Sequence, residues 1–84
     1  MSSLKVELVS PEKRVWSGEA TQISARTLDG DLGILPGHTP LLGVLVDGLV
    51  SIKGVDGTLS EFNVHGGFLS VAKDRVSILG ESTD

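Results

Sequence analysis

The sequence contains no cysteine. This excludes a disulfide framework, a thiolate metal site and a cysteine nucleophile, and it fits a reducing compartment. Long apolar runs are also missing: the longest, residues 41–46, has six residues, whereas a membrane-spanning helix needs about 20. Polar and apolar side chains are mixed over the first nine residues, so we expect neither a signal peptide nor a membrane anchor there.

Basic residues are few and scattered. The chain has 7 lysines and arginines against 11 aspartates and glutamates, for a net charge of −4. No basic stripe is available to neutralise a phosphate backbone, which argues against a nucleic-acid partner. Lysine and arginine are absent from residues 27–52, where Asp29, Asp31 and Asp47 fall. This acidic window is typical of solvated turns, and it also fits a face that meets a basic partner.

Apolar and polar residues alternate along much of the chain, with the two-residue period of half-buried strands. The clearest examples are residues 4–9, 50–54, 61–65 and 75–79. Turn signals separate such runs at Ser10-Pro11, Ser17-Gly18, Asp47-Gly48, Asp56-Gly57 and Lys73-Asp74. We therefore predict an all-β fold, an antiparallel β-sandwich or flattened barrel of about ten short strands. Residues 1–84 are expected to form one domain, since the chain is too short for a second core.

Residues 30–43 contain four glycines, two prolines and a histidine. A phosphate-binding loop is excluded here, because the lysine and the following helix that it needs are missing and two nearby carboxylates would repel phosphate. The prolines restrain residues 36–40, and a preordered loop loses less entropy on binding a surface. This pattern predicts a docking segment.

Catalytic chemistry has little support in the sequence. His38 and His65 are the only histidines, and a zinc site or a nucleophile site needs three or four convergent ligands or a serine-histidine-acid set, whose spacings are absent. We interpret His38 as an exposed loop or interface residue, or as one held by a structural hydrogen bond. We predict no catalytic residue, no metal and no cofactor.

Three other positions have specific interpretations. Gly66-Gly67 permits a bulge or a close backbone approach. Trp16 is interpreted as a core residue, with a binding anchor as the alternative. Lys53 precedes a hairpin signal, and lipoyl and biotinyl carrier domains are small β-sandwiches with a modified lysine at a hairpin tip. The acidic or methionine neighbours that such carriers use are missing, so a carrier domain modified at Lys53 is kept as the alternative function.

Four stretches together resemble the N-terminal domain of the ATP synthase epsilon subunit, which is called delta in mitochondria. They are VELVSPEKRVWSGEA (6–20), GDLGILPGHTPLL (30–42), VHGGFLSV (64–71) and RVSIL (75–79), in the family's order and spacing. The resemblance implies a ten-stranded β-sandwich. It also implies a non-catalytic rotor subunit of the central stalk in a proton-translocating F-type ATP synthase, which couples rotation of the membrane c-ring to the gamma subunit.

The resemblance also implies positions for the contacts. Asp31 and Leu32 would face the loops of the c-ring, whose cationic side chains can pair with Asp31. The expected contacts with the gamma subunit are His38, Thr39, Pro40, Leu41 and Leu42. We expect a peripheral location on the cytoplasmic face of the bacterial plasma membrane, since no transit-like leader is present, and no small-molecule substrate.

Members of this family usually continue after the equivalent of VSILGE into a helical hairpin. That hairpin can restrain ATP hydrolysis and in some members binds ATP. Since the sequence printed here ends at Asp84, the resemblance carries over coupling and assembly, but neither inhibition nor nucleotide binding.

Overall fold

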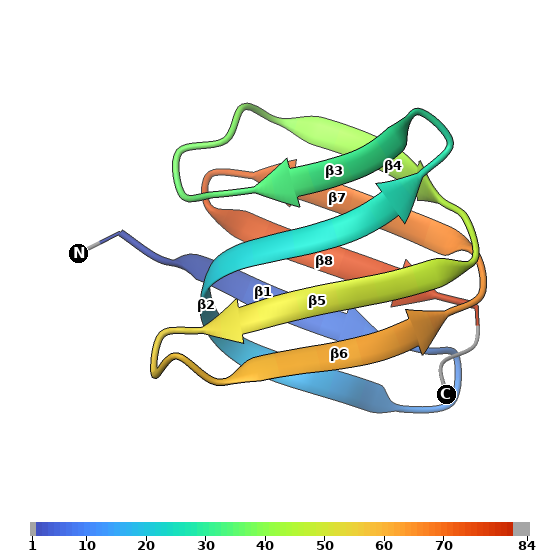
Figure 1. The fold of residues 1–84 in the computed structure, drawn as a ribbon, viewed down its shortest axis with the longest axis horizontal. Helices are drawn as coiled ribbons and strands as arrows, with labels where there is room; N and C mark the ends of the chain where they lie inside the picture. Colours follow the sequence, from blue (N-terminus) through green and yellow to red (C-terminus); the bar gives the residue numbers. More distant parts are fainter. Residues whose placement is uncertain (1, 82–84) are drawn as a thin grey trace.

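A computed structural model describes residues 2–81, and its regular secondary structure consists of eight strands (Figure 1). The strands are β1 (Leu4–Val9), β2 (Arg14–Thr27), β3 (Gly30–Ile34), β4 (Leu41–Leu45), β5 (Gly48–Gly54), β6 (Leu59–Val64), β7 (Gly67–Ala72) and β8 (Arg75–Gly80). The predicted runs 4–9, 50–54 and 75–79 fall within β1, β5 and β8, and the run 61–65 falls within β6 except for its last residue, because strand alternation is a local property of the chain.

The strands form two layers that share β2. In the view of Figure 1, β3, β2, β5 and β6 lie in front of β4, β7, β8 and β1. The long strand β2 pairs with β1 through its first half and with β3 and β5 through its second half, so it carries the sheet from one layer into the other. The predicted all-β sandwich is confirmed.

Three details differ from the sequence prediction. The strand count is eight rather than about ten, partly because β2 continues through the predicted break at Ser17-Gly18. A Cβ on Gly18 would approach the Trp16 ring to 3.1 Å, so this glycine makes room for a side chain and does not end a strand.

Asp47-Gly48 joins β4 to β5, which do not pair with each other, so it links the two layers and forms no hairpin. Finally, β1 and β8 pair in parallel, and all other pairs are antiparallel.

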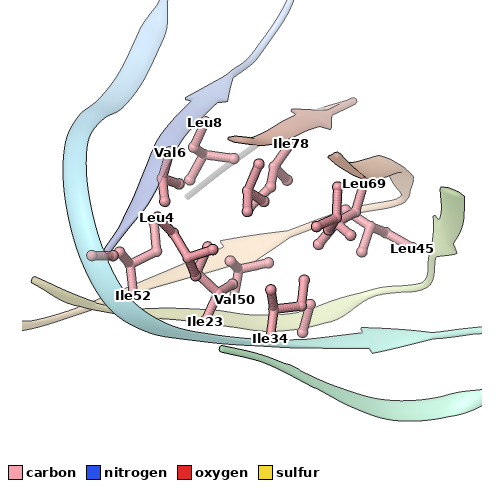
Figure 2. Close-up of a cluster of buried hydrophobic side chains, with 14 of the residues drawn as sticks. Leu4, Val6, Leu8, Ile23, Ile34, Leu45, Val50, Ile52, Leu69 and Ile78 are labelled. Carbon is pink, nitrogen blue, oxygen red and sulfur yellow. The ribbon is translucent and has the colours of Figure 1, made fainter. Parts of the chain in front are cut away.

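Among residues 2–81, fifteen buried apolar side chains fill the space between the layers, and Figure 2 draws 14 of the residues in this cluster. Leu4, Leu8, Ile23 and Ile78 are among the fully buried ones, and they point toward one another from strands of both layers. Trp16 is partly buried against this cluster, in agreement with its interpretation as a core residue. Because the sequence has no cysteine, no disulfide contributes, and burial of this apolar cluster is the main stabilising contribution.

Gly67 is a point of close backbone contact, as the sequence predicted. Its φ angle is +131°, and a Cβ at this position would overlap the carbonyl group of Leu79 in the neighbouring strand β8. A side chain here would therefore displace backbone atoms rather than a flexible side chain.

The connections between strands gather at two ends of the sandwich. The β2–β3 turn and the β4–β5 connection lie on the right in Figure 1, whereas residues 35–40 and the β5–β6 and β7–β8 turns lie on the left. Two of the turns on the left have the positive φ angles that are typical of tight turns. The φ angle is +89° at Gly57 in the β5–β6 turn, and it is 51° and 60° at Lys73 and Asp74 in the β7–β8 turn.

Candidate functional site

Asp31 and Leu32 lie next to each other on β3 and face in opposite directions. Asp31 is exposed, and its Oδ1 lies 3.3 Å from Nε of Arg26, directly across the strand pair. Leu32 is half-buried and packs against the core. Of the two predicted ring contacts, only Asp31 offers its side chain fully to solvent, and Arg26 compensates part of its charge.

Residues 35–40 form a loop that is held in place by a neighbouring turn. The Gly37 N–H donates a hydrogen bond of 2.7 Å to the Asp74 carboxylate, and the His38 N–H donates one of 3.2 Å to the Leu35 carbonyl. Nδ1 of His38 lies 2.7 Å from the carbonyl oxygen of Thr39, so it must carry the proton and donate. This contact matches the structural interpretation of His38, and the loop is preordered.

The two predicted contact regions do not come together. Asp31 and Leu32 lie on β3 near the β2–β3 turn, whereas the loop of residues 35–40 follows the other end of β3, on the opposite side of the view in Figure 1. Leu41 and Leu42 follow that loop on β4 and again face in opposite directions. Leu41 is partly buried against the core, whereas Leu42 is 72% exposed. One molecule can therefore meet two partners through separate regions.

An apolar stripe crosses the outer face of the layer formed by β4, β7, β8 and β1. The strand register places Val44 opposite Phe68, Phe68 opposite Leu79, and Leu79 opposite Val9. Leu42 lies beside this row, and together with Val9, Phe68 and Leu79 it lines a groove of about 150 Å³. We call these five residues the apolar stripe. Val44, Phe68, Leu79 and Leu42 are all classed as exposed, and a contiguous apolar surface of this kind typically marks an interaction site.

Polar groups border the apolar stripe. Ser70 and Ser77 form the next row across β7 and β8, and Glu7 follows on β1. The Glu7 carboxylate is paired with Arg14 at 3.3 Å, so the row carries no uncompensated charge of its own. An apolar centre with a polar rim is the usual anatomy of a protein–protein interface.

Sequence reasoning did not find the apolar stripe. Within each strand the alternation identifies the inward-facing residues, and Phe68 or Leu79 then counts as a single exposed apolar residue of no special meaning. Only the register between four strands aligns these residues into one surface. The sequence did contain one signal. In RVSILG, Leu79 is apolar at a position where the alternation of the strand predicts an outward-facing polar residue.

Lys53 does not occupy a hairpin tip. It is exposed on β5 opposite Leu59, and the β5–β6 turn begins two residues later. The described residues hold no group of three or more histidines, aspartates or glutamates placed to bind a metal ion. Within residues 2–81 we also find no helix with the length and apolar character that crossing a membrane requires.

Comparison with known protein families gives one consistent result. The family model described as "ATP synthase, Delta/Epsilon chain, beta-sandwich domain" matches residues 3–83. An ATP synthase epsilon chain of Rhodococcus erythropolis is 54% identical over 85 residues, covering 100% of this chain and 70% of that protein. An ATP synthase epsilon chain of Micrococcus luteus is 52% identical over 82 residues, covering 98% of this chain and 90% of that protein.

Solved structures share the fold. A chain of the Euglena gracilis mitochondrial ATP synthase, in a structure of its OSCP, F1 and c-ring, superposes with a TM-score of 0.93 at 21% identity. That match covers 100% of this chain and 54% of the other. A chain from the central stalk and c-ring of the Tetrahymena thermophila mitochondrial ATP synthase gives a TM-score of 0.81 at 23% identity, covering 96% and 65%.

Proposed function

The chain belongs to the ATP synthase delta/epsilon chain family, and from this premise we propose that it is a non-catalytic subunit of the central stalk of a proton-translocating F-type ATP synthase. In this role residues 1–84 act as one domain that couples rotation of the membrane c-ring to the gamma subunit. The subunit then sits on the cytoplasmic face of a bacterial plasma membrane, peripheral to it and attached through the complex.

The observation that carries this proposal is the apolar stripe. A preformed apolar surface with a polar rim supports docking onto another protein, and it offers no group that would perform chemistry. We assign the stripe to the gamma subunit because Leu42 belongs both to the stripe and to the segment His38–Leu42. Thr39 and Pro40 are exposed beside it, on a loop that Asp74 holds in place.

The size of the molecule allows two partners at once. Its accessible surface is 5101 Å², and a standard interface takes roughly 800 Å² from each partner. The gamma subunit on the apolar stripe covers the outer face of the layer formed by β4, β7, β8 and β1, and β3 with Asp31 and Leu32 lies in the other layer, open to the c-ring. We expect modest affinity for gamma alone and tighter binding when gamma and ring are held together, because the second contact becomes intramolecular.

The test is size-exclusion chromatography with light scattering, on this chain mixed with the gamma subunit of the same organism. We expect a one-to-one complex that is weakened by polar substitutions at Leu42 and Phe68. A complex that survives both substitutions would contradict the assignment of the apolar stripe. A clean mixture of two monomers, both without and with the detergent-solubilised c-ring, would contradict the proposed function itself.

A further inference from the structure

The outer face that carries the apolar stripe changes from apolar to charged along β1 and β8, which lie side by side in Figure 1. Ser77 and Glu7 form the polar row that borders the stripe. Two residues earlier on each strand, the register places Arg75 beside Lys5, and Glu19 of β2 lies on the other side of Lys5. All five residues are exposed, and they line a groove of about 400 Å³. Its border with the groove of the apolar stripe is the shared row of Ser77 and Glu7.

Lys5 and Arg75 are like charges on neighbouring strands, and we call them the basic pair. Residues in register on paired strands lie about 5 Å apart and point to the same face, so the two cations repel each other. Neither side chain has an ion-pair partner among residues 2–81. The basic pair is therefore a local concentration of positive charge on a chain whose net charge is −4.

The acidic residues around the basic pair do not neutralise it, because other donors hold them. Glu19 accepts a hydrogen bond of 2.8 Å from the Ser3 hydroxyl. Asp74, in the turn before β8, accepts one of 2.7 Å from the Gly37 N–H. Glu7 is held by the ion pair described above. A carboxylate that pairs with these two cations would therefore have to come from another molecule.

We propose that the basic pair binds a carboxylate of the docked gamma subunit and fixes the orientation of gamma on the apolar stripe. This inference rests on the proposed function, in which gamma covers the stripe. A carboxylate placed between two cations relieves their repulsion, and the planar guanidinium of Arg75 can hold both carboxylate oxygens. Because the two grooves share a border, a partner on the stripe reaches the basic pair without leaving the surface.

The strand spacing fixes where this carboxylate must lie. Arg75 is four residues before Leu79 of the stripe, and Lys5 is four residues before Val9, which gives about 13 Å along the strands. A helix of gamma that runs along β8 meets this distance with an apolar residue and an acidic residue about nine positions apart. Apolar burial has no direction of its own. An acidic group at one end of the partner element allows one orientation, since the reverse leaves the basic pair unpaired against gamma.

The experiment measures the Kd for gamma by calorimetric titration at about 50 mM and at about 500 mM salt, because salt screens exposed charges. We expect Lys5→Gln and Arg75→Gln each to raise the Kd about three- to fivefold at low salt, as loss of an exposed ion pair does. At high salt the difference from wild type should disappear. Lys53→Gln removes the same charge from exposed β5 in the other layer. It is the matched control for net charge and should leave the Kd within about twofold.

Three comparisons decide the outcome. Leu42→Ser should raise the Kd at both salt concentrations, since an apolar contact is not screened. An Arg75→Gln variant that equals wild type at low salt would overturn the inference and leave the gamma contact standing. So would a Lys53→Gln variant that is as weak as Arg75→Gln, because net charge alone would then explain the loss. A wild-type chain that fails to bind gamma at either salt concentration would overturn the proposed function, and this inference with it.

An exchange of charges identifies the partner group. Arg75→Glu should raise the Kd for wild-type gamma about tenfold or more at low salt, because it sets a negative charge against the carboxylate. Among gamma variants that each replace one acidic residue by lysine, one should restore binding to Arg75→Glu. Restoration by none of them would overturn the inference. The urea midpoint of both glutamine variants should equal that of wild type, and a clear fall would assign the basic pair to the fold and not to binding.

Discussion

Replacement of Leu42 by serine should separate docking from folding. Leu42 is 72% exposed, so only about a quarter of its side chain is buried in the isolated domain. Burial of a whole leucine side chain contributes about 1.5–3 kcal/mol. Docking can cover the exposed remainder of the side chain. Its removal in Leu42→Ser should cost about 1–2 kcal/mol of binding free energy, which corresponds to a Kd for gamma about 5- to 30-fold higher. The part already buried limits the loss of unfolding free energy to below about 1 kcal/mol.

Calorimetric titration with the gamma subunit measures the first quantity, and urea unfolding measures the second. Leu59→Ser is a matched control, because Leu59 is 59% exposed on β6, in the layer that does not carry the apolar stripe. It should lower stability by a similar small amount and leave the Kd unchanged. Equal loss of affinity in both variants would refute the reasoning, since serine would then act through general destabilisation. An unchanged Kd in Leu42→Ser would remove Leu42 from the interface.

Three further predictions concern the domain itself. Gly67→Ala should lower the unfolding free energy by about 2 kcal/mol or more, because the new methyl group overlaps a backbone carbonyl. Gly43→Ala, where the Cβ meets only ordinary contacts, should cost clearly less in the same urea titration. The Thr58 N–H donates to the Asp56 carboxylate and lowers its pKa below the ordinary 3.8. Asp56 therefore stabilises the fold above about pH 4 and loses this effect as the pH falls through the lowered pKa, so the difference in stability between wild type and Asp56→Ala should shrink as the pH is lowered. Intact mass of the chain purified from its own cells should show Lys53 unmodified, and a lipoyl or biotinyl adduct would contradict this.

The fold class could be predicted because its signals are local. A two-residue period over four or more residues decides which side of a strand is apolar, and a glycine or an aspartate at a turn decides where the chain reverses. The sequence signal failed at Ser17-Gly18, where glycine serves the packing of Trp16 and not a turn. It also failed at Asp47-Gly48, because two consecutive strands can belong to different layers.

The sequence by itself determined the class of the domain, its inward-facing residues and the absence of cysteine chemistry. It also placed an ordered, proline-restrained segment before Leu42 and an acidic window around Asp29 and Asp31. Only the tertiary structure decided which exposed residues act together. The register of four strands aligns the apolar stripe, and the pairing of β2 with β3 sets Arg26 against Asp31. Such neighbours are far apart in the chain or on different strands, and no local pattern specifies the distance between them.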